Sequence, residues 1–212
     1  MNLHSYFSKP TGALGWLAGQ IMARQNRERS EFVLAVLDLQ PSDRVLEIGF
    51  GPGIDIQRAS RTAAFVAGVD HSSLMVGQAT RRNAAAIRDG RVKLELGTAN
   101  HLPFPDAHFD KVFAINSAQF WKDLVPTLRE VGRVLKPGGT LALAIQPRNK
   151  GATSEHAFQA GRGFADAMKK AGFENIYSES REIKPVTTVC VLCRSALVGQ
   201  PVSPAASRAG AK

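Results

Sequence analysis

A glycine-rich segment after an apolar run is the clearest candidate for chemistry in this chain. The segment VLEIGFGPGIDI, residues 45–56, places Gly49, Gly51 and Gly53 at alternate positions, with Glu47 two residues before the first. Glycines in a turn after a buried strand let a ligand approach the backbone closely. The segment therefore predicts a ligand-binding loop.

The residues around this loop distinguish between kinds of ligand. A phosphate-binding P-loop needs Lys followed by Ser or Thr after its last glycine, whereas Ile54 and Asp55 follow Gly53 here. A dinucleotide loop has the spacing G-x-G-x-x-G, and Ile54 stands where its third glycine belongs. The Glu47 carboxylate would also repel a pyrophosphate. The loop favours a ligand that carries an ammonium or a sulfonium.

A second acidic residue follows at a useful distance. Asp70, in the segment GVDHSS, lies nineteen residues after Gly51 and ends the next apolar run. A carboxylate at the end of that strand can accept hydrogen bonds from ribose hydroxyls. The alternative is an N-cap on the next helix, which Ser72 or Ser73 could provide instead. We favour ribose binding for Asp70.

These residues need a sheet that brings the ends of its strands together. Apolar runs alternate with helical patterns, which predicts a parallel sheet covered by helices on both faces. Strands are expected at 44–48, 65–69, 92–96, 110–115 and 140–145, and helices at 54–61, 73–88 and 124–135. The segment LKPGG after the last helix predicts a helix stop and a turn.

The last third of the chain has a different pattern. A helix is expected over 154–171, followed by strand-like runs at 174–183 and 186–194 that should pair as a hairpin. The expected fold is α/β, a Rossmann-like, doubly wound, seven-stranded and mostly parallel sheet with a C-terminal antiparallel hairpin. Residues 198–212 lack bulky apolar groups and are expected to be disordered.

The N-terminal part is expected to form a helical cap, residues 1–40, on a binding domain of residues 41–197. Its two short helices are predicted at 11–23 and at 30–39, the second with Ser30 as N-cap. The cap is interpreted as a lid, as a membrane-surface helix followed by basic residues, or as simple packing on the sheet edge. The sequence contains no run of about 20 apolar residues, so no membrane span is expected.

Four motifs, in order, resemble those of the class I S-adenosylmethionine-dependent methyltransferases. They are VLEIGFGPG (45–53), GVDHSSLMVGQA (68–79), LGTANHLPFPDAHFDKVFAINSAQFW (96–121) and LREVGRVLKPGG (128–139). The resemblance covers residues 43–144 and is strongest to the small-molecule and quinone-type members. It implies S-adenosylmethionine as cofactor and methyl transfer as the reaction.

The resemblance also implies a role for individual residues. Glu47 and the backbone of Gly49, Gly51 and Gly53 would hold the methionine part of the cofactor, and Asp70 its ribose. His71 would lie beside the adenine, with Thr98 and Ala99 at its edge. The family often has Asp where Thr98 stands, so adenine recognition would rest on the Ala99 backbone or on Asn100. Asn116, at the end of the fourth strand, would face the methionine moiety and the reaction centre.

The acceptor side is less defined by the sequence. The cofactor brings its own leaving group, so the protein chiefly positions the acceptor and excludes water. Candidate acceptor-pocket residues are Ser117, Gln119, Phe120 and Trp121 after the fourth strand, and Tyr6 in the cap. Trp121 could equally be a core anchor. His101 and His108 are candidate bases, but loop-surface positions are favoured for both, and no catalytic residue is assigned.

Composition limits the partners. The chain has 212 residues and a formal net charge of +9, which suits a single globular domain. Its one basic cluster is interpreted as a solvated helix face, so we do not expect nucleic acid as a partner. The cluster comprises Arg81, Arg82, Arg88, Arg91 and Lys93. Salt-dependent nucleic-acid binding would support the contrary view.

The two cysteines, Cys190 and Cys193, fall three apart in a strand-like run. Residues three apart on a strand point to opposite faces, so neither a metal nor a redox site is expected. Ordinary thiols suit a reducing cytoplasm, which is the expected location. The sequence thus predicts a methyltransferase that acts on a small, apolar or aromatic acceptor. The alternatives are a lipid or quinone methyltransferase at the membrane surface and a non-catalytic cofactor-binding protein.

Overall fold

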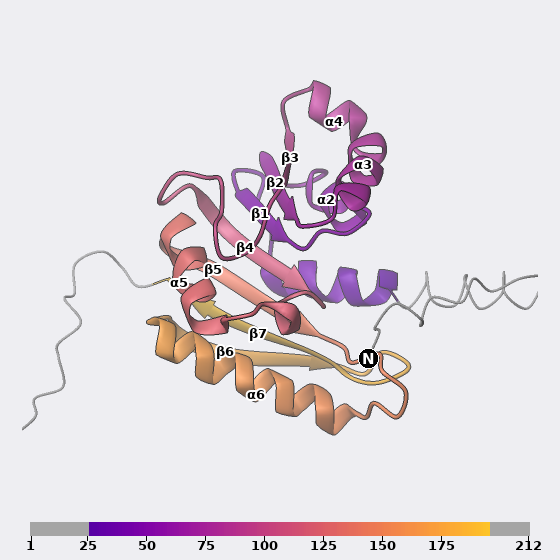
Figure 1. Cartoon of the computed structure of the whole chain (residues 1–212), viewed down its shortest axis with the longest axis vertical. Helices are drawn as coiled ribbons and strands as arrows, with labels where there is room; N and C mark the ends of the chain where they lie inside the picture. The colour runs from indigo at the N-terminus through magenta and orange to yellow at the C-terminus, as the bar shows by residue number, and fades with distance from the viewer. Residues whose placement is uncertain (1–25, 196–212) are drawn as a thin grey trace, which may run out of the picture.

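A seven-stranded sheet organises the computed structural model, which describes residues 26–195. The strand order is β3-β2-β1-β4-β5-β7-β6 (Figure 1). The strands are β1 (Arg44–Ile48), β2 (Phe65–Asp70), β3 (Val92–Leu96), β4 (Phe109–Ile115), β5 (Leu135–Ile145), β6 (Glu174–Arg181) and β7 (Thr188–Arg194). The first five run parallel, whereas β7 is antiparallel to both β5 and β6. The expected fold class is confirmed.

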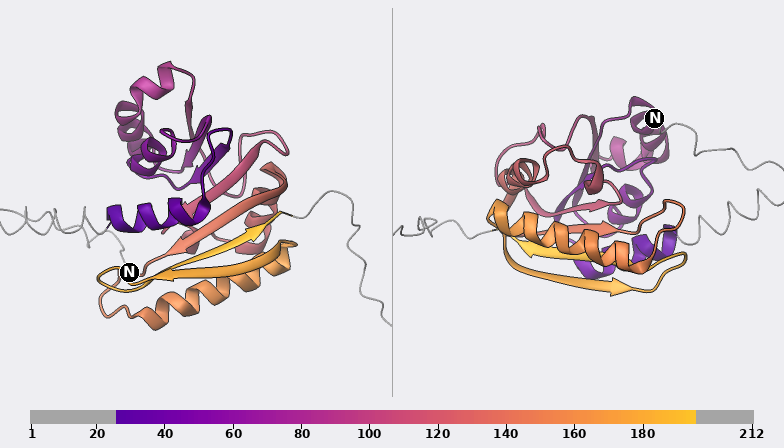
Figure 2. Two further views of the ribbon diagram at one scale, coloured as in Figure 1. Left: turned by 180° about the vertical axis from the view of Figure 1, so that it is seen from behind. Right: turned by 60° about the horizontal axis from the view of Figure 1, so that its bottom comes forward.

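Helices cover both faces of the sheet. They are a helix over residues 26–37, α2 (Ile54–Ala59), α3 (Ser73–Arg82), α4 (Ala84–Arg88), the short η2 (Ala118–Phe120), α5 (Leu124–Val134) and α6 (Ser154–Ala171). In Figure 1, α5 and α6 lie in front of the sheet. Seen from behind, the helix of residues 26–37 lies in front of it instead (Figure 2, left). The central strands are therefore buried between two helical layers, as their apolar residues require, whereas the edge strand β6 is largely exposed.

Each layer has its own apolar core. One core joins the sheet to α5 and α6 and contains Leu128, Val131, Phe164 and Met168. The other core joins it to α2 and to residues 26–37, whose Phe32, Val33 and Leu37 are buried. Cys193 belongs to the first core and Cys190 to the second, which confirms that the two thiols face opposite ways. Burial raises the pKa of each thiol to about 12, so both stay protonated at neutral pH.

The prediction of a helix that begins at Ser30 is wrong. The helix already includes residues 26–29, and the Ser30 hydroxyl donates to the Asn26 carbonyl at 2.9 Å. A hydroxyl bonded to the carbonyl four residues earlier belongs inside a helix. Residues 26–31 are all polar and carry no apolar stripe, so the apolar periodicity that predicts this helix begins only near Phe32. The helix predicted over 11–23 lies outside the described residues.

The continuous helix predicted over 73–88 is also wrong. The helix is interrupted at Asn83, where φ is −101° and ψ is 15°, and α4 begins at the next residue. The buried Asn83 side chain donates to the carbonyls of Gly53, at 3.1 Å, and Ala79, at 2.9 Å. An amide that bonds to nearby backbone competes with the helix, and here it ties the end of α3 to the glycine loop.

The turn predicted in LKPGG is wrong as well. The chain passes from α5 directly into β5 at Leu135, which pairs with Phe109 of β4. Regular pairing resumes only between Lys111 and Thr140, so the glycines form an irregularity inside the strand rather than a separate turn. The hairpin of β6 and β7 is confirmed, with strands shorter than expected at 174–181 and 188–194. The helix predicted over 154–171 is α6.

Candidate cofactor site

The predicted cofactor residues come together at the carboxyl edge of the sheet. Gly49 follows β1, Asp70 ends β2, Thr98 lies just after β3 and Asn116 follows β4. The strand order reverses between β1 and β4, because later strands continue on the side of β1 opposite to β2. In open α/β sheets, ligands bind outside the carboxyl ends of the strands at such a reversal.

The three glycines of the loop have different structural reasons. All have positive φ: 78° at Gly49, 53° at Gly51 and 74° at Gly53. A Cβ on Gly49 would lie 2.4 Å from the Ser117 Cβ, and one on Gly53 would lie 2.6 Å from the Ala79 Cβ. A Cβ on Gly51 would meet nothing within 4 Å. Packing therefore demands the outer two glycines, whereas Gly51 faces open space into which a ligand can approach.

Asp70 holds this loop in place. Its side chain is only 6% exposed, and its two oxygens accept from the backbone N–H of Gly51, at 2.8 Å, and of Ser72, at 2.9 Å. Ser72 caps α3, because its Oγ accepts from the Met75 N–H at 3.4 Å. The N-cap alternative for Asp70 is therefore wrong. Each carboxylate oxygen keeps a second lone pair, with which it can accept a ligand hydroxyl.

Glu47 is a buried carboxylate with an unsatisfied oxygen. It is 3% exposed, and its Oε2 has no hydrogen-bond partner. Burial, assisted by the negative charges of Asp55 and Asp70, raises its pKa well above the ordinary value, against a hydrogen bond from the Ile56 backbone. Unsatisfied buried acceptors are rare in proteins. This one stands beside the glycine loop and fits a cationic or hydrogen-bond-donating group.

The residues predicted around an adenine lie beside Asp70. The Gly97 N–H donates to the Asp70 carbonyl at 3.0 Å, which joins the end of β3 to the end of β2. The His71 side chain is 84% exposed, with its Nδ1 3.7 Å from a carboxylate oxygen of Asp70. Thr98 is exposed, and Ala99 packs on the core.

Asn116 and Ser117 hold strand ends together. Asn116, at φ 52°, accepts from the Gln146 N–H at 2.7 Å and donates to the Gln146 carbonyl at 3.2 Å. Ser117 donates to the Ile48 carbonyl at 2.6 Å. The side chains that the sequence assigned to methionine and acceptor contacts are thus bonded to the ends of β5 and β1.

The other acceptor candidates form the turn after β4. Gln119 is exposed and donates to the Asn116 carbonyl at 3.0 Å. Phe120 is 75% exposed, whereas Trp121 is half-buried and packs on the core. Tyr6 lies outside the described residues.

The two histidines lie at different edges of the sheet. His101 is exposed and lies near the carboxyl edge, where its backbone N–H donates to the Thr98 carbonyl at 3.2 Å. His108 precedes β4 at the opposite edge, between Phe104 and Phe109. Burial and the nearby Arg44 lower its pKa. His108 is therefore too far along the strand to act as a base at the carboxyl edge.

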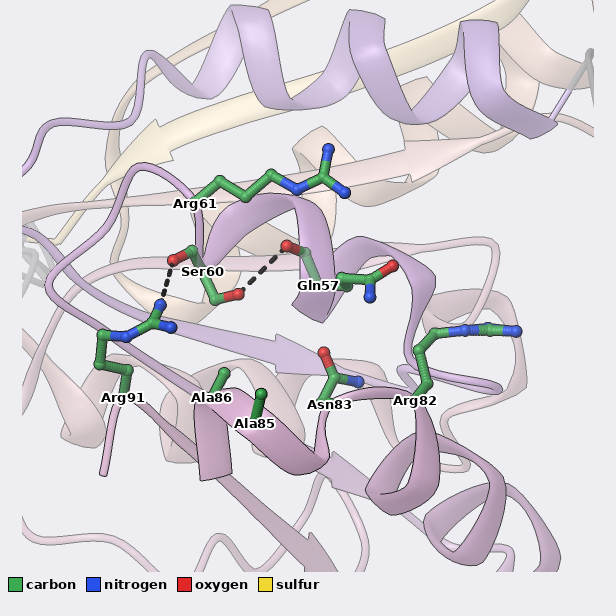
Figure 3. Close-up of a pocket in the computed structure, with 8 residues that line it drawn as sticks. All are labelled: Gln57, Ser60, Arg61, Arg82, Asn83, Ala85, Ala86 and Arg91. Atoms are coloured by element: carbon green, nitrogen blue, oxygen red, sulfur yellow. Dashed lines mark hydrogen bonds between the residues drawn. The ribbon is translucent and has the colours of Figure 1, made fainter. Parts of the chain in front are cut away.

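A surface hollow of about 400 Å³ lies to one side of this site, between α2 and α4 (Figure 3). Asn83 lines it, together with Arg61, Arg82 and Arg91. Two of these arginines are bonded to backbone carbonyls, Arg82 to Pro52 at 3.1 Å and Arg91 to Ser60 at 2.8 Å. None of the predicted cofactor residues lines this hollow.

Sequence reasoning missed Gln146, which is 1% exposed and lies directly after β5. Its signal was present, because a polar residue ends an apolar strand run there just as Asn116 does after β4. It also missed Arg29, which is buried in the helix of residues 26–37 and bonded to Gln146. No sequence pattern marks that arginine.

Comparison with known proteins agrees with this geometry. Residues 46–143 match the family model described as a methyltransferase domain. An uncharacterized methyltransferase of Bacillus subtilis, YdaC, is 33% identical over 180 residues, which are 84% of this chain and 97% of YdaC. The chain belongs to the class I S-adenosylmethionine-dependent methyltransferases.

Other relatives of this methyltransferase are larger. The 27-O-demethylrifamycin SV methyltransferase of Amycolatopsis mediterranei is 37% identical over 134 residues, 60% of this chain and 49% of that one. The cycloartenol-C-24-methyltransferase of Arabidopsis thaliana is 28% identical over 74% of this chain and 52% of its own. The chain thus spans about half the length of these two relatives.

Solved structures support the fold of this methyltransferase. A S-adenosylmethionine-dependent methyltransferase from Aquifex aeolicus superposes with a TM-score of 0.65 at 21% identity, over 84% of this chain and 98% of that one. The cofactor is S-adenosylmethionine. The unsatisfied Glu47 oxygen and the open space at Gly51 fit its ammonium and its close approach to the backbone.

Proposed function

We propose that this methyltransferase transfers the methyl group of S-adenosylmethionine to a small-molecule acceptor with an apolar or aromatic body. The observation that carries the proposal is Phe120, which is 75% exposed in the turn after β4. An aromatic side chain exposed at the carboxyl edge of the sheet suits contact with an apolar or aromatic ligand. The relatives named for a rifamycin and for a sterol substrate support a small organic acceptor.

We propose the following cofactor contacts, which the sequence predicted and the geometry supports. Glu47 would accept a hydrogen bond from the cofactor's ammonium, and the Gly51 backbone would lie against the methionine moiety. Asp70 would accept from the ribose hydroxyls, because both of its oxygens keep a lone pair beyond the loop contacts. His71, Thr98 and Ala99 would surround the adenine. Gly49, Gly53, Asn116 and Ser117 would shape this site through packing and backbone hydrogen bonds.

The chemistry asked of the protein is modest. The cofactor supplies a positively charged sulfur as leaving group, so the chain has to align the acceptor and keep water out. A general base is needed only for an acceptor that is protonated at neutral pH. Of the histidines weighed as bases, only the exposed His101 lies at the carboxyl edge. The proposal therefore places catalysis in orientation and assigns no catalytic residue.

The proposal is tested with a panel of phenols, amines, thiols and quinols, incubated with S-adenosylmethionine while the demethylated product is measured. Turnover with an aromatic member is expected. Binding of the cofactor without turnover on any member would instead support a non-catalytic cofactor-binding protein.

The role of Phe120 is tested by replacing it with serine. With an acceptor found in the panel, the Phe120→Ser variant should raise KM by about 10-fold, because contact with one aromatic ring is lost. Tyr177→Ser is the matched control, since Tyr177 is 51% exposed on the edge strand β6. Equal KM values in the two variants would remove Phe120 from the acceptor site.

The remaining expectations stay proposals. Residues 1–40 are proposed as a cap on the domain of residues 41–197, with 198–212 as a tail. Residues 26–37 of the cap pack on the sheet, and the other cap residues lie outside the description. No helix among residues 26–195 is long and apolar enough to cross a membrane. Sedimentation with anionic vesicles distinguishes the membrane-surface alternative, and a cytoplasmic location stays a prediction.

A further inference from the structure

Arg29 is a buried cation whose hydrogen bonds are incomplete. It is 8% exposed, and its Nε has no hydrogen-bond partner. One of its terminal nitrogens donates to Gln146 Oε1 at 3.1 Å. Among residues 26–195, no carboxylate forms an ion pair with it. Since a buried charge is costly unless it is paired, this arrangement calls for a counter-charge in direct contact with Arg29, which no carboxylate of the described residues supplies.

A second arginine converges on the same oxygen. Arg148, just after β5, places a terminal nitrogen 3.4 Å from Gln146 Oε1 and also donates to Asn26 Oδ1. It too has no ion pair with a carboxylate in the described part of the chain. Two guanidinium groups therefore share one neutral oxygen. Two positive charges brought together in this way repel each other unless an anion lies between them.

Gln146 cannot turn away from the arginines. Its Nε2 donates to the carbonyls of Ile183, at 2.8 Å, and Val186, at 2.9 Å, which fixes its oxygen on the side of Arg29 and Arg148. Its backbone is held by both side-chain atoms of Asn116. Gln146 thus presents its oxygen to both arginines at the ends of β4 and β5, at the carboxyl edge that holds the candidate cofactor site.

The electrostatics agree with this geometry. Burial, and then repulsion from Arg148, lower the pKa of Arg29 to about 10, against a weaker attraction from Asp55. Partial burial also lowers the pKa of Arg148. Both remain cations at neutral pH. An anion between them would offset the cost of desolvation and reduce the repulsion between the two cations.

We propose that Arg29 and Arg148 form a subsite for the carboxylate of a small molecule bound at this edge of the sheet. The planar, two-oxygen carboxylate suits two guanidinium groups and would satisfy the free Arg29 Nε. This inference rests on the proposed function, and it deepens it. Two molecules at the site can supply such a group, the methionine moiety of the cofactor and an acidic acceptor.

The experiment compares wild type with Arg148→Gln, because Arg148 is at the surface and its replacement should not unfold the chain. Arg88→Gln on α4 is the matched control, since it removes an exposed arginine of equal charge. Calorimetry measures the binding of S-adenosylhomocysteine and of its decarboxylated analogue. A second series measures the binding of benzoate and of neutral benzamide to protein saturated with S-adenosylhomocysteine. Arg29→Lys serves as a second variant and is used only if its circular dichroism matches wild type.

One of two results would support the subsite. If the cofactor supplies the carboxylate, Arg148→Gln should bind S-adenosylhomocysteine about 10- to 100-fold more weakly and the decarboxylated analogue as wild type does. If the acceptor supplies it, S-adenosylhomocysteine should bind equally, while saturable benzoate binding disappears and benzamide binding is absent throughout. Arg88→Gln should behave as wild type in both series.

The proposal is overturned if S-adenosylhomocysteine and benzoate both bind to Arg148→Gln and to folded Arg29→Lys as they bind to wild type, or if benzoate binds no better than benzamide while cofactor affinity is unchanged. Failure of the proposed function has a different signature. In that case wild type binds S-adenosylhomocysteine and the arginine variants give one of the binding results described above, but no acceptor of the panel is methylated.

Discussion

The open space beside Gly51 yields the sharpest prediction about cofactor binding. The change is Gly51→Ala, with Gly90→Ala as control. Both glycines have positive φ, 53° at Gly51 and 71° at Gly90, and a Cβ on either would meet nothing within 4 Å. Gly90 lies in the turn between α4 and β3, at the opposite edge of the sheet. The two substitutions therefore impose a similar backbone strain and no clash in the unliganded protein.

The magnitudes follow from this match. An L-residue in the left-handed region costs roughly 1–2 kcal/mol, so both variants should lose about that much unfolding free energy and roughly 2–8 °C in Tm. Only at Gly51 does the new methyl group enter the space that the cofactor is proposed to occupy. Overpacking by one methyl costs about 1–3 kcal/mol, so Gly51→Ala should bind S-adenosylhomocysteine about 10- to 100-fold more weakly.

Two assays check the prediction. Thermal unfolding without ligand measures the backbone cost, and calorimetry with S-adenosylhomocysteine measures the affinity. The reasoning is refuted if Gly51→Ala and Gly90→Ala bind with equal affinity, because the open space would then not face the cofactor. A further variant, Gly49→Ala, should lose more stability than either, since its Cβ would lie 2.4 Å from the Ser117 Cβ.

Two further predictions concern the carboxylates. Asp70→Ala should weaken S-adenosylhomocysteine binding by about 1–3 kcal/mol in calorimetry, because it removes the proposed ribose acceptor and frees the Gly51 N–H; unchanged affinity with an intact fold would leave Asp70 only a loop support. The pKa of Glu47 is raised in the folded protein. Between pH 4.5 and that raised pKa, the folded protein therefore binds more protons than the unfolded chain. Without ligand, the contribution of Glu47 to stability thus falls as the pH rises through this range. Glu47→Gln should remove this fall in urea unfolding at pH 5 and pH 8 and raise stability at pH 8 while it weakens cofactor binding; a variant less stable than wild type at pH 8 would contradict it.

The sequence predicted a mostly parallel sheet covered by helices on both faces, because buried parallel strands leave a strong apolar signal. Each strand that alternated with a helix was found within a few residues of its expected bounds, except that β5 begins earlier. What failed were boundaries decided by single polar side chains. Asn83 interrupts a helix where its side chain bonds to the Gly53 carbonyl. That partner lies thirty residues earlier in the chain, so no local sequence pattern reveals the interruption.

The site was predicted to the level of its backbone and missed at the level of its supports. Gly49, Gly51, Gly53 and Asp70 gather as expected, since the carboxyl ends of parallel strands must meet at one edge. The sequence could not divide the glycines into those needed for packing and the one that faces open space. It also could not show that Asn116 and Ser117 bond to Gln146 and Ile48, because those hydrogen bonds join strand ends far apart in the chain; their predicted ligand contacts stay a prediction.

The placement of the two cysteines has a practical consequence. Cys190 and Cys193 are the only cysteines of the chain, and both are buried thiols whose pKa is about 12. Thiol reagents attack the exposed thiolate, so the folded protein should leave both native sulfurs unlabelled. A single cysteine introduced at Phe120 would then carry a fluorophore alone, without deletion of the native ones. Fluorescence from this label would then report on the turn beside the candidate site in a chain that is otherwise unchanged.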